Sequence, residues 1–149
     1  MRQKNEQPVG WHSRGYLPHF DGGEIAQFVT FRLGDSAPTS VIERWKQELA
    51  LEPEEIRDSL LRRRIETYLD QGYGACYLKD PKVGEKVESS ILHFDGERYR
   101  MSAWVVMPNH THMLLTPCAG YDLSGIMHSI KSYTANEVNR LLKRKGRFW

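Results

Sequence analysis

The stretch that decides the fold is Met107-Pro108-Asn109-His110-Thr111-His112-Met113-Leu114-Leu115. It predicts a turn at Pro108-Asn109 between a hydrophobic strand and a second strand that begins with two histidines. Side chains alternate between the faces of a strand, so His110 and His112 point the same way, about 6.5–7 Å apart along the chain. That spacing lets two imidazoles share one metal ion. A pair of hydrogen-bonded histidines on an ordinary sheet gives the same pattern.

Two more segments of the chain are predicted to be strands. Residues 98–107 run into the Pro-Asn turn, so they are expected to pair antiparallel with residues 110–116. Residues 27–33 are rich in β-branched and aromatic types, which predicts another strand. One of its faces carries Val29, Phe31 and Leu33, and the other carries Phe28, Thr30 and Arg32. The second face could stack a base and hold a phosphate, and an ordinary half-buried sheet face has the same composition.

Helices are predicted before and after these strands. Ser40-Val41-Ile42-Glu43 fits a capping box, Pro53 suits the start of a second helix that ends at Gln71-Gly72, and Asp80-Pro81 opens a third. The apolar positions expected to face inward are Val41, Ile42, Trp45 and Leu49, then Ile56, Leu60, Leu61, Ile65, Tyr68 and Leu69, then Val83, Val87 and Ile91. Asp122 is the candidate N-cap of the last helix. The order of strand, helices, strands and helix predicts an α+β fold with helices on an antiparallel sheet.

The composition fits one domain. The chain has 149 residues, of which 40% are hydrophobic and 27% charged, values typical of a globular protein with a sizeable core. No apolar run approaches the ~18 residues of a membrane span, and the polar start is unlike a signal peptide. Cys76 and Cys118, without Cys-x-x-Cys spacing, indicate free thiols in a reducing cytoplasm. We expect a flexible segment over 1–13 and one domain over 14–149.

The net charge of +2 is unevenly placed. Residues 122–149 carry +4, and the rest of the chain carries −2. A basic carboxy-terminal segment on a near-neutral body indicates a polyanionic partner. A solvated helix end would show the same charge pattern.

The last helix contains two further candidate functional residues, Tyr133 and Glu137. Its inward face is predicted to carry Leu123, Ile126, Ile130, Tyr133 and Glu137. A tyrosine on an apolar stripe is ordinary, but an unpaired buried carboxylate is costly. A metal ion held by the two histidines would offset that cost and leave open positions for substrate and water. Alternatively, Glu137 lies at the edge of the stripe and reaches solvent.

Five stretches carry a family resemblance. They are Met-Pro-Asn-His-Thr-His-Met-Leu-Leu at 107–115, Ile-Lys-Ser-Tyr-Thr-Ala-Asn-Glu-Val-Asn-Arg-Leu-Leu at 130–142, Arg-Gly-Tyr-Leu-Pro-His-Phe at 14–20, Phe-Val-Thr-Phe-Arg-Leu at 28–33 and Gly-Ala-Cys-Tyr-Leu at 74–78. Together they resemble the REP-associated tyrosine transposases, single-tyrosine members of the HUH endonuclease superfamily related to the IS200-like transposases. The resemblance covers most of the chain from Arg14 onward.

The resemblance implies a ferredoxin-like HUH fold, with an antiparallel sheet flanked by helices. It implies His110 and His112 as paired ligands of Mg²⁺ or Mn²⁺, Glu137 as the third ligand and Tyr133 as the nucleophile. The implied activity is DNA transposition and recombination: nicking and rejoining of single-stranded, hairpin-forming DNA through a 5′-phosphotyrosyl intermediate. The resemblance also implies that the protein acts on nucleoid DNA in the cytoplasm. The recognised DNA sequence and the oligomeric state, a homodimer included, stay open.

The expected DNA contacts are mostly basic. Those in the last segment are Lys131, Arg140, Lys143, Arg144 and Lys145, and those elsewhere are Arg14, His19 and Arg32. Two other functions compete with the nicking enzyme. A non-catalytic DNA-binding module would need these cations but neither the histidines nor Tyr133. A metal-dependent hydrolase would keep the metal ligands, use water and dispense with Tyr133.

Overall fold

The computed structural model describes residues 10–13 and 18–149, with the backbone alone for 10–13 and 18–21. A three-stranded antiparallel sheet lies at its centre, in the order β3-β5-β4. Strand β3 spans Gln27–Arg32, β4 spans Tyr99–Val106 and β5 spans His110–Pro117. The histidine stretch is therefore the middle strand, which has a hydrogen-bonded neighbour on each side. The predicted antiparallel pairing across the Pro-Asn turn is confirmed.

The register of the sheet decides which side chains share a face. Residues directly opposite one another in a sheet point to the same side. Thr30 lies opposite His112, and Arg32 lies opposite His110. The even-numbered residues of β5 therefore share one face with Phe28, Thr30 and Arg32, as the alternation predicts. We call this the histidine face.

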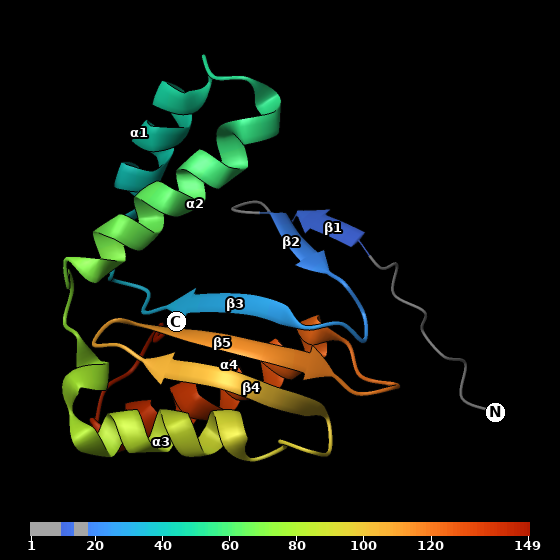
Figure 1. Ribbon diagram of the computed structural model, residues 1–149. Coiled ribbons are helices and arrows are strands. Elements are labelled where there is room, and N and C mark those ends of the chain that lie inside the picture. The colour runs from blue at the N-terminus through green and yellow to red at the C-terminus, as the bar shows by residue number, and fades with distance from the viewer. Residues whose placement is uncertain (1–9, 14–17) are drawn as a thin grey trace.

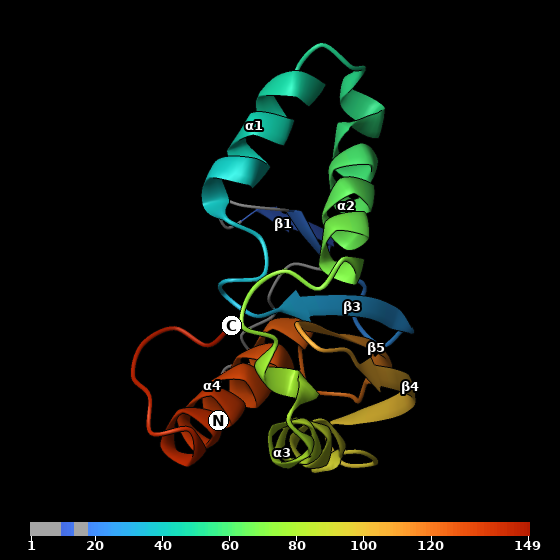
Figure 2. The same ribbon diagram turned by 90° about the vertical axis from the view of Figure 1, so that its left-hand side faces the viewer.

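The opposite face is covered by two helices, α3 (Pro81–Leu92) and α4 (Leu123–Leu141), as Figures 1 and 2 show. Met113 and Leu115 of β5 are fully buried there. They pack in the main core, whose other buried members are Phe31, Leu33, Leu78, Val83, Val87, Ile91, Tyr99, Ile126, Ile130, Val138, Phe148 and Trp149. The three predicted apolar positions of α3 are confirmed, and Asp80 caps the helix by accepting a hydrogen bond from the Lys82 amide. A short 3₁₀ turn, Tyr77–Lys79, precedes α3.

The other two helices form a hairpin that projects from the histidine side of the sheet (Figures 1 and 2). Helix α1 spans Thr39–Leu49 and α2 spans Glu54–Asp70. They enclose a small core of their own, made of Ala37, Ile42, Leu49, Leu61, Ile65 and Leu69. Two details of the prediction are wrong. Pro38 caps α1 without a side-chain bond, so there is no capping box. Ile56, which was expected to face inward, is 42% exposed.

The inward face of α4 also differs from the prediction. Its buried residues are Ile126, Ile130, Thr134 and Val138, whereas the Tyr133 side chain is 52% exposed. Thr134 can be buried because its hydroxyl donates to the Ile130 carbonyl and accepts a hydrogen bond from Trp149 Nε1. With Thr134 satisfied in the core, the helix is rotated so that Tyr133 faces outward. The Asp122 cap of α4 is confirmed by the bond that it accepts from the Gly125 amide.

A two-stranded antiparallel ribbon, β1 (Gly10–Ser13) and β2 (Pro18–Asp21), lies apart from the main sheet (Figure 1). The architecture as a whole is α+β, with helices packed on an antiparallel sheet, and this confirms the predicted fold class. Over 10–13 and 18–149, no helix is both long and apolar enough to cross a membrane.

Candidate functional site

The histidine pair is the candidate site, because its two rings converge at one point on the sheet. His110 Nε2 lies 3.1 Å from His112 Nε2. Two nitrogens bound at right angles to one metal ion, about 2.1 Å from each, would be about 3.0 Å apart. His110 is 1% exposed and His112 is half-buried, so the rings are held by packing and the point of convergence is open on the His112 side. The donor set therefore fits a shared metal ion.

Asn109 determines which nitrogen of His110 carries the proton. The Asn109 amide nitrogen donates to the carbonyls of Leu69 and Tyr73, at 3.1 Å each, so its oxygen must point the other way. That oxygen lies 2.8 Å from His110 Nδ1, which therefore donates to it. In a neutral ring, Nε2 is then left with a free lone pair. The end of α2 thus fixes the orientation and the tautomer of an imidazole of β5.

The second ring is supported from β3. Thr30 Oγ1 lies 2.8 Å from His112 Nδ1, and a hydroxyl can donate or accept there. Phe28 stacks on His112, with ring centroids 5.3 Å apart and an angle of 24° between the planes. Phe28 is itself 64% exposed. An exposed aromatic face beside the histidines could stack a base of single-stranded DNA, as the sequence alternation suggests.

The charge around His110 favours its neutral form. Burial, and then the neighbouring His112, lower the pKa of His110 below its ordinary value, while the Asp70 carboxylate raises it to a smaller extent. Asp70 Oδ1 lies 3.8 Å from His110 Nε2. A neutral imidazole is the form that binds metal. Asp70 and Asn109 were not singled out as functional residues from the sequence, because only the fold brings the end of α2 to the start of β5.

Tyr133 and Glu137 are not brought to the histidines within one chain. Both lie on α4, which packs on the face that carries Met113 and Leu115, and the histidines lie on the other face. Glu137 instead contacts Arg140 through Oε1 and Lys86 Nζ, at 3.5 Å, through Oε2. In the described part of the chain, no three His, Cys, Asp or Glu side chains gather closely enough to hold a metal ion.

Two of the predicted DNA contacts meet at the end of β3. Burial, and then Arg147 and Arg32, lower the pKa of Lys131, and burial and then Arg147 lower that of Arg32. Arg147 had not been predicted as a contact. Its stem lies over Gly34, where any β-carbon would lie 3.2 Å from it. Two half-buried cations beside the exposed Arg147 repel one another and favour binding of an anion.

The other predicted DNA contacts differ from one another in exposure and in hydrogen-bond or ion-pair partners. Arg140 pairs with Glu137, and Arg144 lies over the Tyr77 ring and bonds to Asn139 and to the Arg147 carbonyl. Lys143 and Lys145 are exposed and follow the end of α4. Arg14 lies outside the described residues. His19 is described by its backbone in β2, opposite His12.

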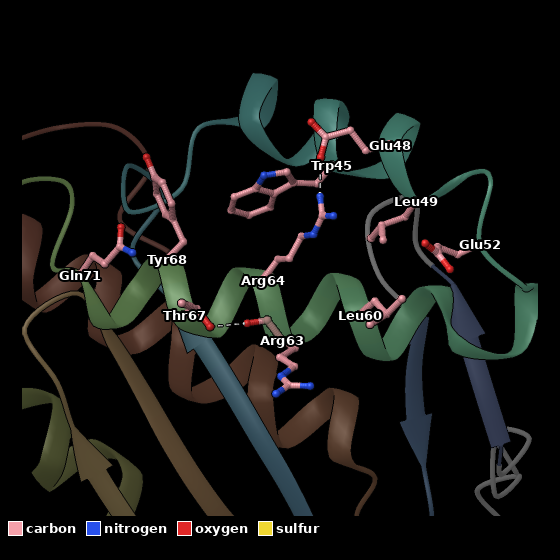
Figure 3. A pocket seen from close by; sticks show the side chains of 10 residues that line it. All are labelled: Trp45, Glu48, Leu49, Glu52, Leu60, Arg63, Arg64, Thr67, Tyr68 and Gln71. Atoms are coloured by element: carbon pink, nitrogen blue, oxygen red, sulfur yellow. Dashed lines mark hydrogen bonds and ion pairs between the residues drawn. The ribbon is translucent and has the colours of Figure 1, made fainter.

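A hollow lies between α1 and α2 (Figure 3). Trp45 and Tyr68 line it with their rings edge to face, and Arg64 pairs with Glu48 across it. It contains no imidazole, and this ion pair already satisfies two of its charges. We therefore place the candidate chemistry at the histidine pair.

We expect Asn109→Ala to weaken Mn²⁺ binding by about 10- to 100-fold, because His110 loses the partner that fixes its tautomer. Asn136→Ala is the control, because Asn136 is exposed on α4, and it should bind Mn²⁺ like the wild type. Mn²⁺ titration followed by electron paramagnetic resonance measures both, with thermal melting as the folding check. Wild-type affinity in a folded Asn109→Ala would contradict this role of the amide oxygen.

Comparison with known proteins gives one family match. The family model described as "Transposase IS200 like" matches residues 77–149, which is just under half of the chain. The matched part contains α3, β4, β5 and α4, and so includes the histidine pair and Tyr133. This match supports the IS200-like transposase family and with it a transposase-type enzyme acting on DNA. The search of curated proteins found no match. The search of solved structures found none either.

Proposed function

We propose that the protein is a metal-dependent endonuclease and strand transferase of single-stranded DNA, of the REP-associated type. The observation that carries the proposal is the 3.1 Å approach of the two Nε2 atoms, which fits a divalent ion such as Mg²⁺ or Mn²⁺. The family match over 77–149 agrees with it. The substrate would be hairpin-forming DNA of the nucleoid, and the protein would act in the cytoplasm.

In this mechanism the chain's own residues bind, orient and attack. His110 and His112 would hold the ion, which supplies Lewis-acid polarisation of the scissile phosphate when bound. Tyr133 Oη would lose its proton as it attacks phosphorus. The bond from phosphorus to the 3′ oxygen breaks, and that oxygen leaves as a 3′-hydroxyl after gaining a proton. The 5′-phosphotyrosyl bond conserves the phosphodiester, so another 3′-hydroxyl can reverse the step and join strands.

The position of Tyr133 adds a requirement to this proposal. Its helix covers the face opposite the histidines, so Tyr133 reaches them either from a second copy of the chain or after α4 has moved. A homodimer in which α4 of one copy lies against the histidine face of the other would satisfy the requirement. In the sequence prediction Glu137 was the third ligand, and it travels with Tyr133 because the two are one helical turn apart.

A covalent-adduct assay tests the proposal. Wild-type protein is mixed with a hairpin-bearing oligonucleotide, labelled at its 3′ end, and Mn²⁺. The expected product is a labelled protein band that survives denaturation, because a tyrosine joined to the 5′-phosphate retains the downstream fragment. A hydrolase would cleave the oligonucleotide without forming this band. A pure binding module would shift the oligonucleotide in a native gel and leave it intact, and either result would overturn the proposed function.

Binding of single-stranded DNA should weaken with salt. Each phosphate that the cations neutralise contributes a log–log slope of roughly −0.7. Changing Lys131 to Gln removes one charge of the group at the end of β3 and should make the slope shallower by about that amount. Lys46→Gln, on α1, is the control and should leave the slope unchanged. Fluorescence anisotropy between low and moderate salt measures the slopes, and a salt-independent affinity would argue against a DNA partner.

A further inference from the structure

We propose that Asp70 is the third protein ligand of the metal ion held by His110 and His112. This inference rests on the proposed function of the histidine pair and names the carboxylate that completes it. Among the described residues, Asp70 is the carboxylate within ion-pair distance of a ring nitrogen that faces the site, with Oδ1 3.8 Å from His110 Nε2. The remaining positions around the ion would be left for water and for oxygens of the scissile phosphate.

The distance is compatible with shared coordination. Two donors about 2.1 Å from one ion are about 3.0 Å apart at right angles and about 4.2 Å apart when opposite, and 3.8 Å lies between these limits. As the side chains stand, they do not form a complete three-ligand group. Asp70 is the last residue of α2 and its side chain is 65% exposed, so its carboxylate can turn towards His112 without disturbing the core.

The charge at the carboxyl end of α2 also favours a cation beside Asp70. The carboxyl end of a helix carries partial negative charge, so a further carboxylate there is unfavourable. Helix α2 has no basic residue in its last turn to offset Asp70. The helix end is also anchored beside His110, since Asn109 holds the Leu69 carbonyl. A divalent cation between Asp70 and the two imidazoles would neutralise this concentration of negative charge.

Glu137, the ligand expected from the sequence, is engaged elsewhere in the chain. Its carboxylate is paired with Arg140 and Lys86, and its side chain is only 19% exposed. To reach an ion on the histidine face, it would have to leave Lys86 of α3. Asp70 lies on the correct face already and contacts one of the histidines.

Mn²⁺ binding by the full chain without DNA tests this assignment. Free Mn²⁺ is measured by electron paramagnetic resonance during titration of the wild type, Asp70→Asn, Glu66→Gln and Glu137→Gln. We expect Asp70→Asn to weaken binding by at least about tenfold, since even the loss of an outer partner costs 10- to 100-fold. Glu66 lies one turn earlier on α2 and is exposed, so Glu66→Gln controls for the loss of one negative charge on the same helix. It should bind within about twofold of the wild type, as should Glu137→Gln.

Wild-type affinity in Asp70→Asn, or a tenfold loss in Glu137→Gln instead, would overturn the assignment. His112→Ala separates this failure from that of the proposed function. If His112→Ala abolishes binding while Asp70→Asn does not, the histidine site stands and Asp70 is not a ligand. If the folded wild type binds no Mn²⁺, both proposals fall. Thermal melting in chelator checks that each variant is folded.

Discussion

Replacing His110 and His112 together by alanine is expected to abolish nicking, with a rate loss of about a thousandfold or more. The pair would hold the ion that stabilises developing negative charge on the phosphate. The loss of several kcal/mol of that stabilisation corresponds to three or more factors of ten. Chelation of the wild type should have the same effect, and it should add nothing to the double variant.

The control for this experiment is His128→Ala, because His128 is exposed on α4, away from the histidine face. It should nick at the wild-type rate. Thermal melting is needed for the double variant, since His110 is fully buried beside Asn109 and alanine leaves a space there. Undiminished nicking by the folded double variant in chelator would rule out the histidine pair as the metal site.

Replacing Tyr133 by phenylalanine should eliminate the covalent adduct while DNA binding persists. The substitution removes one oxygen from a side chain that is 52% exposed, so it should change stability little. Tyr121→Phe is the matched control, because Tyr121 is also exposed and lies just before α4. Tyr99 is a poor candidate nucleophile: it is fully buried and its hydroxyl donates to the Ile91 carbonyl.

Mixing the two inactive proteins then locates the nucleophile. A preparation that contains the double histidine variant and Tyr133→Phe combines intact histidines from one chain with an intact tyrosine from the other. Recovery of part of the adduct would show that α4 acts across two copies, and no recovery would show that α4 moves within its own chain. An adduct in Tyr133→Phe equal to that of the wild type would move the nucleophile to another residue.

The sheet could be predicted from the sequence because its signals are local. The alternation around His110 and His112, the turn at Pro108-Asn109 and the β-branched run at 27–33 each report on their own neighbours. The buried face of α4 could not be predicted from the sequence, because the burial of Thr134 depends on a hydrogen bond from Trp149, fifteen residues later. A hydroxyl that bonds to its own helix and to a distant indole behaves as a core residue, although its type is typical of surfaces.

The histidine pair was visible in the sequence for the same local reason, but its surroundings were not. Asn109 bonds to carbonyls about 40 residues earlier in the chain, and Asp70 is equally distant from His110. No periodicity relates these positions. Glu137 was an attractive ligand on a predicted inward stripe, whereas the structure pairs it with Lys86 of α3. Partners of this kind follow from tertiary packing alone.

The Asn109 side chain links the histidine pair to the projecting hairpin of α1 and α2. Helix α2 is held mainly by the small core that it shares with α1, and small cores open at lower free energy than large ones. When the last turn of α2 unwinds, the Leu69 carbonyl releases the Asn109 amide, and His110 is free to rotate and change tautomer. We therefore expect denaturation in two stages: metal release with fraying of the projecting hairpin, followed by cooperative melting of the sheet.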